Sequence, residues 1–138
     1  MPLLRAIIDT NVVFEGLTQQ GGAPGMIIDV WAAGLFRACV SNALSYEYED
    51  VLSRKLSDIR WRRIKPALGA LLDKSEFVTV YYTWRPASPD PGDDHLIDCA
   101  LNSGGMIVTS NIRDFREAEK SLGLTVMTPA GFVTFMAY

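Results

Sequence analysis

The sequence predicts an α/β fold: a mostly parallel sheet flanked by helices on both faces. Strand and helix patterns alternate along the whole chain with short connections between them, which is typical of parallel sheets. The 138 residues are 49% hydrophobic and 21% charged, which is an ordinary globular composition at a common domain length. No internal repeat, low-complexity tract or linker divides the sequence. We therefore expect one domain over residues 1–138.

Two strands and one helix are predicted in the first forty residues. Residues 3–8 form a short apolar strand, and residues 36–40 form a second one. Between them, residues 26–33 have a helical pattern that begins after the loop QQGGAPG and ends at Gly34.

The middle of the chain is predicted to be mainly helical. Ser41 is placed to cap a helix through NALSYEYEDVLSRK. The next segment, DIRWRRIKPALGALLDKS, predicts a helix pair or one kinked helix, because Pro66 breaks or bends a helix. A third strand, EFVTVYY, follows and is rich in β-branched and aromatic residues.

The last part of the chain returns to alternating elements. The segment RPASPDPGDD is a loop, because its prolines cannot continue a helix, and a helix is predicted from residue 93 to residue 102. GMIVTS predicts the fourth strand, FREAEKSLG a helix that ends at Gly123, and LTVMT the fifth strand. Pro129 then opens a final short helix through AGFVTFM.

Acidic and amide side chains follow two of these strands. Asp9 comes directly after the first strand, and Asn111 and Asp114 come just after the fourth. An unpaired carboxylate near an apolar interior costs several kcal/mol or shifts its pKa, so its position needs a reason. Parallel sheets bind ligands at the carboxyl ends of their strands. These side chains would lie close together if the first and fourth strands are neighbours.

Glu47 has an unusual position on its predicted helix. It lies three residues after Leu44 and four before Val51, which places it on the apolar stripe, whereas Glu49 and Asp50 point toward solvent. Two structural explanations remain open: the long side chain can extend to solvent, or it can pair with an arginine.

A third acid is expected near the start of the helix in PDPGDDHLIDCAL. Asp93 precedes Leu96 by three residues and so joins the apolar face, whereas Asp94 and Asp98 share a more exposed side. Asp93 is therefore the first choice, with Asp90 and Asp94 behind it. The alternative is that these acids only stabilise the helix N-terminus, where the macrodipole is positive.

The acidic positions together indicate a metal site. They come from four separated segments, and several carboxylates cannot converge near a core without a compensating charge. All-oxygen ligands suit a hard cation, Mg²⁺ or Mn²⁺. In phosphodiester hydrolysis such ions bind the scissile phosphate, activate water and stabilise the leaving oxygen. The candidate residues are Asp9, Glu47, Asp93, Asn111 and Asp114.

At these positions the sequence resembles a PIN domain, the small nuclease fold found in VapC-type toxins of bacterial and archaeal toxin–antitoxin pairs. IIDTNV resembles the opening strand and first acid, and VSNALSYEYEDVL resembles the helix of the second acid. DPGDDHLIDCAL resembles the helix of the third acid, where Asp93 aligns best. IVTSNIRDF and VMTPAGF resemble the closing strand, the fourth polar position and the last helix. The four motifs occur in the family's order over essentially the whole chain.

The resemblance implies a five-stranded parallel sheet in the order 3-2-1-4-5 and a ribonuclease that depends on Mg²⁺ or Mn²⁺. Asp9, Glu47, Asp93 and Asp114 would hold the metal, and Asn111 would complete or orient its shell. The substrate would be RNA, and a small cognate antitoxin would insert a segment near the active site. The resemblance also allows a homodimer.

The same resemblance implies supporting roles for polar residues near these acids. Thr10 or Asn11 would shape the turn after the first strand, and Ser110 would bond a phosphate or an acid. Asn111 is a departure, because many PIN domains have an aspartate there. Asp114 would then supply the charge, or the site would hold one metal ion in place of two.

Basic residues gather in RKLSDIRWRRIK and near the fourth strand. Arg60, Arg62 and Arg63 surround Trp61, which predicts contacts with RNA phosphates and stacking on a base. The alternative is a solvated helix face whose Trp61 turns toward the core or a dimer interface. Arg113 and Arg116 are comparable candidates for binding phosphate.

Other features narrow the function. Cys39, Cys99 and His95 are isolated, so we expect two buried structural thiols and no zinc site. No apolar run is long enough to cross a membrane, and the start of the chain lacks a signal-peptide pattern, which favours a cytoplasmic protein. The net charge of −3 argues against a surface that binds nucleic acid everywhere.

Two other functional classes compete with the nuclease. A PIN-like module that binds RNA or protein without cleavage is favoured by Asn111. A signalling receiver or a phosphatase would need further acids beside Asp9, where Thr10 and Asn11 stand. Neither GxxxxGK[ST] nor GxGxxG occurs, so the sequence gives no support for those kinds of nucleotide binding.

Overall fold

A five-stranded parallel sheet forms the centre of the molecule, and its strand order is β3-β2-β1-β4-β5. The computed structural model describes residues 3–19, 21–83 and 93–137. The strands are β1 (Arg5–Ile8), β2 (Arg37–Val40), β3 (Glu76–Phe77), β4 (Met106–Val108) and β5 (Val126–Met127). This order confirms the sheet expected from the sequence, and it places the first and fourth strands side by side.

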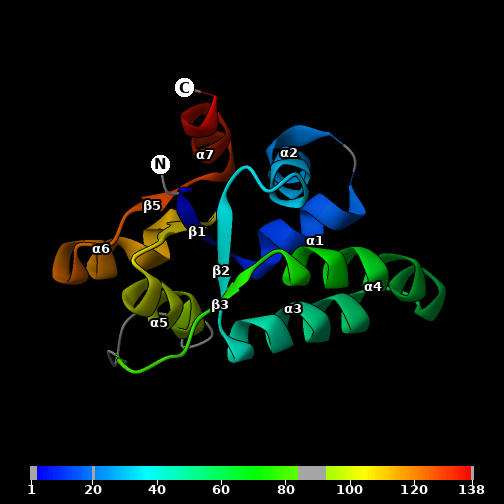
Figure 1. The fold of residues 1–138 in the computed structure, drawn as a ribbon, viewed down its shortest axis with the longest axis horizontal. Coiled ribbons are helices and arrows are strands. Elements are labelled where there is room, and N and C mark those ends of the chain that lie inside the picture. The colour runs from blue at the N-terminus through cyan, green and yellow to red at the C-terminus, as the bar shows by residue number, and fades with distance from the viewer. Residues whose placement is uncertain (1–2, 20, 84–92, 138) are drawn as a thin grey trace.

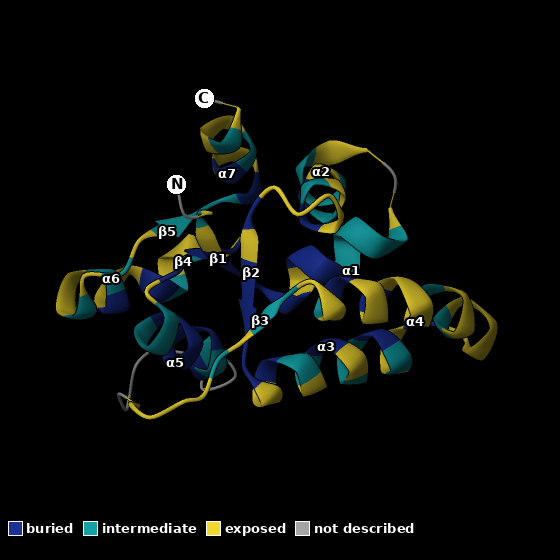
Figure 2. Cartoon of the chain, viewed as in Figure 1, coloured by how far each residue is buried: buried dark blue, intermediate teal, exposed yellow. Residues whose placement is uncertain are grey.

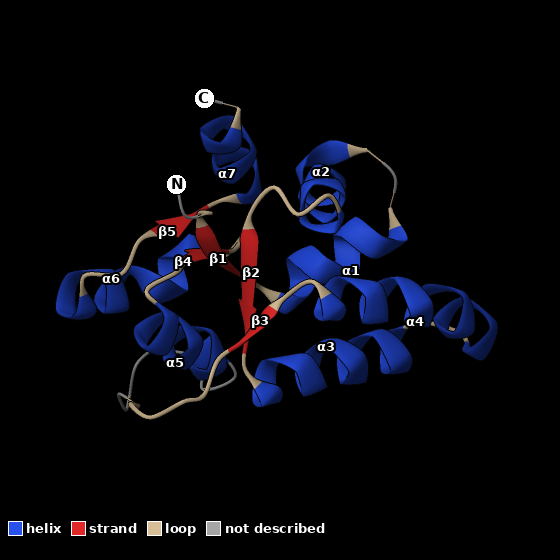
Figure 3. Ribbon diagram, in the orientation of Figure 1, coloured by secondary structure: helices blue, strands red, loops and turns tan. Residues whose placement is uncertain are grey.

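Helices cover both faces of the sheet (Figures 1 and 3). Helix α5 lies on one side against β1, β2 and β4, and α1 lies on the other side with α2, α3 and α4 packed around it. The last helix, α7, packs on α2. The helices are α1 (Thr10–Thr18), α2 (Gly22–Ala32), α3 (Asn42–Lys55), α4 (Asp58–Asp73), α5 (Asp94–Ser103), α6 (Arg116–Leu122) and α7 (Pro129–Met136), with a short 3₁₀ helix, η2 (Ile112–Phe115).

The core is continuous across the sheet because its central strand is buried on both faces. Ala6, Ile7 and Ile8 of β1 are fully buried, and Figure 2 shows the buried residues gathered along the central strands. Trp31 and Tyr48 add large aromatic side chains from α2 and α3. This packing holds the carboxyl ends of β1 and β4 at fixed positions, which is what a binding site at that edge requires.

The first two helices differ from the expectation. The sequence pattern did not predict α1, whose Val12 and Val13 favour strands when considered alone. Packing against α2 and α3 stabilises the helix there. Helix α2 begins at Gly22, inside the predicted loop QQGGAPG, and Pro24 is tolerated because the first turn of a helix needs no N–H from it.

Glycine allows α1 and α2 to cross closely. A Cβ added at Gly16 would lie 2.4 Å from the Ile28 Cγ1 atom and 2.6 Å from the carbonyl oxygen of Pro24. The second contact is with backbone, which cannot move aside easily. The close approach of α2 therefore requires glycine at position 16. This packing helps to hold α1, which begins directly after Asp9.

Two later elements also differ from the prediction. Helix α4 runs through Pro66 as one helix, which excludes the helix pair and agrees with the alternative of a single helix. Strand β3 has two residues in place of seven, because β2, its one neighbour within the described part of the sheet, ends at Val40, where the chain turns into α3. The side chain of Asn102 then bonds the backbone of Tyr81 and Tyr82, at 2.8–3.0 Å.

No helix in the described ranges is both long enough and apolar enough to cross a membrane.

Candidate functional site

Asp9 lies at the carboxyl edge of the sheet, where β1 passes into α1. Its backbone N–H donates to the carbonyl oxygen of Val108 at 2.9 Å, so the residue stays within the β1–β4 pairing. The residue is only 7% exposed. Thr109, which follows β4, donates its hydroxyl proton to Asp9 Oδ2 at 2.7 Å. The predicted acid after the first strand is thus a buried carboxylate held by the neighbouring strand.

The charge on Asp9 is unfavourable in this environment. Burial raises the pKa of its carboxyl group above the ordinary value. The hydrogen bond from Thr109 lowers this pKa in part, as do the backbone N–H groups of Asn11 and Thr10, but the nearby negative charge of Asp114 raises it again. A bound cation would offset both the burial and the repulsion.

Glu47 is connected to the same edge through Thr10. The hydroxyl group of Thr10, the first residue of α1, donates to Glu47 Oε2 at 3.0 Å. Glu47 is half-buried, as its place on the apolar stripe predicted. The next residue, Tyr48, is fully buried and donates its hydroxyl proton to the carbonyl oxygen of Ile8. Helix α3 is therefore anchored directly to the end of β1.

The hydroxyl group of Tyr48 remains a donor over the physiological pH range. Burial raises its pKa well above the ordinary value, and the nearby Cys99, Asp9 and Glu47 raise it further. The hydrogen bond from Thr10 to Glu47, at 3.0 Å, places Glu47 beside the residue that directly follows Asp9.

The acids of α5 correct the sequence prediction. Asp94 and Asp98, expected on a more exposed side, are each only 6% exposed, whereas Asp93 is half-buried just before the helix. The prediction assumed one buried face, but α5 packs on β1, β2 and β4 and also on α3. Asp90 lies outside the described residues. The expected exposure of Asp94 and Asp98 is therefore wrong, whereas the choice of Asp93 as the third acid stays a prediction.

The segment after β4 supplies the remaining predicted residues. Ser110 and Asn111 are exposed, and Asp114 is half-buried in η2. The N–H of Asn111 donates to Thr109 Oγ1 at 3.1 Å, and the N–H of Asp114 donates to the carbonyl oxygen of Asn111 at 3.1 Å. This turn brings Asp114 close enough to act on the charge of Asp9.

The donor set is chemically suited to Mg²⁺ or Mn²⁺, because it consists of carboxylate oxygens with one amide oxygen. The structure brings only part of the predicted group together. Within residues 3–19, 21–83 and 93–137, no three side chains of His, Cys, Asp or Glu lie close enough to form a metal-binding group. The clearest feature is the buried Asp9 carboxyl group, whose ionised form is opposed mainly by burial and to a smaller extent by the charge of Asp114.

Comparison with known proteins identifies the family. The sequence profile of the PIN domain matches residues 5–113, most of the chain. The chain belongs to the PIN domain family. No curated protein matches its sequence.

Solved structures share the fold of this PIN domain at low sequence identity. PAE2754 from Pyrobaculum aerophilum matches with a TM-score of 0.64 and 16% identity, covering 97% of this chain and 90% of that one. VapBC2 from Rickettsia felis, bound to a DNA fragment from its promoter, matches with a TM-score of 0.61 and 12% identity, covering 91% and 98%. FitAB bound to IR36 DNA matches with a TM-score of 0.61 and 13% identity, covering 90% and 94%.

The predicted RNA-contacting residues of the PIN domain fall into two groups. Arg113 and Arg116 are exposed and flank Asp114 in sequence. On α4, Trp61 is half-buried and packs against the core, and the Nζ atom of Lys65 lies 6.0 Å from its ring centre. This packing supports the structural alternative for Trp61. The exposed residues Arg60, Arg62 and Arg63 remain available to solvent.

Both cysteines of the PIN domain are buried in the core, as the sequence predicted. Burial raises the pKa of Cys99 to about 12, so this thiol stays protonated and unreactive at neutral pH. His95 is half-buried on α5 and belongs to no metal-binding group within the described ranges.

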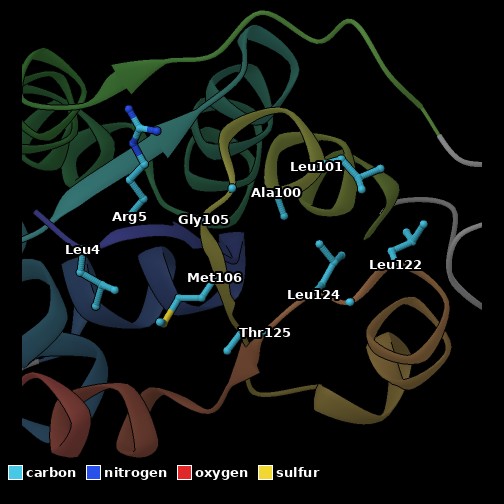
Figure 4. Close-up of a pocket in the computed structure, with 11 residues that line it drawn as sticks. Leu4, Arg5, Ala100, Leu101, Gly105, Met106, Leu122, Leu124 and Thr125 are labelled. Carbon is cyan, nitrogen blue, oxygen red and sulfur yellow. The ribbon is translucent and has the colours of Figure 1, made fainter. Parts of the chain in front are cut away.

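A hollow at the opposite end of the same strands is separate from the acidic edge. It has a volume of about 370 Å³ and lies beside the amino ends of β1 and β4, where Arg5, Ala100 and Met106 line it (Figure 4). Arg5 already pairs with Glu76 at 2.9 Å. With mainly aliphatic and backbone lining, this hollow offers no group for the chemistry predicted at Asp9.

Sequence reasoning missed two residues of the site, Thr109 and Tyr48. Thr109 is a hydroxyl-bearing residue directly after a strand, but only the pairing of Ile8 with Val108 places it opposite Asp9. Tyr48 lies four residues after Leu44, on the apolar face of its helix, and a tyrosine there was the available signal, because a buried tyrosine hydroxyl group is usually hydrogen-bonded.

Proposed function

We propose that this PIN domain is an endoribonuclease that depends on Mg²⁺ or Mn²⁺ and acts as the toxin of a toxin–antitoxin pair. The observation that carries the proposal is the buried Asp9, whose ionised form is opposed both by burial and by the charge of Asp114. Such an arrangement costs stability unless a cation binds there. Membership of a family whose members are generally nucleases gives the cation its role.

Each acid has a defined part in this proposal. Asp9, Glu47 and one acid of α5 hold the metal, and Asp114 adds negative charge. Asp94 takes precedence over Asp93 because it is the buried one of the two. When bound, the divalent ion would stabilise charge on the phosphate and activate water.

The neighbouring residues orient the acids or bind substrate. Thr10 holds Glu47 by its hydroxyl group, and Asn111 contributes a neutral oxygen beside Asp114. Arg113 and Arg116, exposed next to Asp114, bind the RNA phosphates on either side of the scissile bond. Asn11 and Ser110 are exposed at the same edge and bond phosphate oxygens.

More distant arginines extend the substrate surface. Arg60, Arg62 and Arg63 are exposed on α4 and contribute charge rather than base stacking, because Trp61 packs against the core. Each contact with phosphate makes binding more sensitive to salt. Replacing all three with glutamine would reduce the salt dependence of RNA binding without a change in sequence preference.

The partner in this proposal is a small antitoxin. VapBC2 and FitAB, which share the fold, were solved bound to DNA, in one case a fragment of the promoter. We infer for this chain a cognate antitoxin that covers the acidic edge, and a homodimer of the PIN domain, residues 1–138, within a cytoplasmic complex.

The test is cleavage of a mixed RNA pool by purified, antitoxin-free protein in Mn²⁺, Mg²⁺ or EDTA. The proposal expects metal-dependent cleavage that Asp9→Asn abolishes. Asp73→Asn, the same change at an exposed position of α4, provides a matched control that should cut normally. Absence of cleavage with either metal, by protein shown to be folded by circular dichroism, would overturn the proposal.

A second function is favoured by a specific observation. Among the residues that the structure describes, no three acids form a metal-binding group, and Asn111 lacks the charge of an aspartate. A PIN-like module that binds RNA or protein without cutting would have both features. RNA binding that survives EDTA, together with no cleavage under any metal, would select this function over the nuclease.

A further inference from the structure

Thr109 occupies a rigid position at the acidic edge. It follows β4 directly and is fully buried, and its backbone N–H donates to the carbonyl oxygen of Met127 at 2.9 Å. The backbone of Thr109 is therefore held to β5, and the preceding residue, Val108, accepts the N–H of Asp9 at 2.9 Å. Because the side chain is also buried, its hydroxyl group needs a partner within the protein.

The two hydrogen bonds of this hydroxyl group have a fixed direction. The N–H of Asn111 can only donate, so Thr109 Oγ1 accepts from it, at 3.1 Å. An ionised carboxylate can only accept, so the hydroxyl proton points to Asp9 Oδ2, at 2.7 Å. The order is therefore Asn111 N–H to Thr109 oxygen, and Thr109 O–H to Asp9.

This chain of bonds continues to the second acid. The N–H of Asp114 donates to the carbonyl oxygen of Asn111 at 3.1 Å. Asp9 on β1 and Asp114 on η2 are thus joined through Asn111 and Thr109, and the hydroxyl group of Thr109 is the single side-chain link between the β4 segment and Asp9 in this path.

Asp9 needs such a link because its own geometry does not fix its carboxylate. The terminal torsion of an aspartate side chain is broad, so the two oxygens can rotate about the last bond. The hydrogen bond from Thr109 fixes Oδ2 from the β4 side, and the backbone N–H groups of Asn11 and Thr10 act on the same carboxyl group from α1. In metalloproteins, loss of a group that supports a metal ligand in this way typically lowers metal affinity or activity by about 10- to 100-fold.

We propose that Thr109 is a positioning residue that sets the orientation of the Asp9 carboxylate at the edge where a divalent cation would bind. This inference rests on the proposed function. Thr109 touches neither substrate nor metal in this account and acts only through Asp9 and Asn111.

The test compares Thr109→Val, Thr109→Ser and Thr134→Val. Valine keeps the shape of threonine but removes the hydroxyl group, and serine keeps the hydroxyl group but removes the methyl group. Thr134 is exposed on α7, so Thr134→Val is the same chemical change away from the site. The affinity for Mn²⁺ is measured on RNA-free protein by electron paramagnetic resonance, which detects the free ion. This readout does not depend on RNA cleavage.

The proposal predicts that Thr109→Val weakens Mn²⁺ binding by about 10- to 100-fold, a typical loss for a residue that supports a metal ligand. Thr109→Ser should bind within about threefold of the natural protein, because it retains the donor. Thr134→Val should bind normally. Equal Mn²⁺ affinity in Thr109→Val and the natural protein would overturn the role of Thr109 while leaving the proposed nuclease intact.

A second measurement tests Thr109 even if the natural protein binds no metal. A crystal structure of metal-free Thr109→Val should show the Asp9 carboxylate rotated or in more than one orientation, whereas Thr109→Ser should keep one. An unchanged, single orientation of Asp9 in Thr109→Val would contradict the inference. Failure of the natural protein to bind Mn²⁺ would instead count against the proposed function.

Discussion

The two ends of strands β1 and β4 hold charge in opposite ways. At the amino end, Arg5 is exposed and forms a solvent-accessible ion pair with Glu76 at 2.9 Å. At the carboxyl end, Asp9 is buried and the like charge of Asp114 lies near it. The first arrangement costs little and contributes little to stability. The second costs stability, and a bound cation would offset that cost.

Among these substitutions, Asp9→Asn at the carboxyl end should reduce RNA cleavage the most. RNA cleavage should fall by more than about 100-fold, because even residues that only support metal ligands are worth 10- to 100-fold. The amide oxygen of asparagine can still accept the hydrogen bond from Thr109, so the fold should persist. Cleavage assays beside circular dichroism check both parts. Retained cleavage would show that the carboxyl end is not the catalytic edge.

The same variant predicts a dependence of stability on pH. Asp9 has a raised pKa in the folded protein, so the native state holds its proton to higher pH than the unfolded state does. In the natural protein, this group's contribution to stability therefore falls as pH rises from the ordinary value of 3.8 through the raised value. Metal-free Asp9→Asn should melt at a higher temperature at pH 7, with the difference shrinking toward low pH. If the two proteins differed in melting temperature by the same amount at every pH, the claim that burial raises the pKa of Asp9 would be contradicted.

The two neighbouring acids of α5 provide a matched pair. Asp94→Asn should lower cleavage at least about tenfold more than Asp93→Asn, because the buried acid is the one proposed to support the metal. Both variants make the same chemical change one residue apart. Initial rates at saturating Mn²⁺ give the comparison, and a larger loss in Asp93→Asn would restore the choice made from sequence.

Tyr48→Phe removes only the hydroxyl group that joins α3 to the end of β1. The free energy of unfolding should fall by about 1–3 kcal/mol, the cost of a buried hydrogen bond that loses one partner. Cleavage should fall with it, because Glu47 is the next residue on the same helix. Urea denaturation measures the first effect. Unchanged stability would show that α3 is held by packing alone.

Arg5→Ala at the amino end should have the smallest effect. The exposed Arg5–Glu76 pair contributes about 0–1 kcal/mol to the free energy of unfolding, and the acidic edge should keep its activity. Denaturation and cleavage assays on the same preparation test both statements. A loss of activity as large as that of Asp9→Asn would contradict the claim that only the carboxyl end is the catalytic edge.

Short apolar runs located the five strands, although β3 is shorter than predicted, and the resemblance to PIN domains supplied their order. Ser41 accepts a hydrogen bond from the N–H of Leu44 at 3.2 Å, as the predicted cap requires. Asp9 was found because a carboxylate after a buried strand is anomalous whatever the fold. These signals are local, so they can be read without knowing what lies across the core.

The missed features depend on contacts between distant segments. Helix α1 forms although Val12 and Val13 favour strands, because α2 and α3 pack against it. Asp94 and Asp98 are buried because α5 has the sheet on one side and α3 on another. Periodicity in one segment cannot show a second neighbour. Thr109 likewise meets Asp9 across 100 positions of sequence, through strand register alone.

The central claim is that the carboxyl end of β1 and β4 is a cation site. Thermal unfolding at neutral pH with increasing Mn²⁺ tests it most directly, because a ligand that binds only the folded state raises the melting temperature with its concentration. The account predicts a rise for the natural protein and for Arg5→Ala, and none for Asp9→Asn. An equal rise in all three proteins, or no rise in the natural protein, would contradict it.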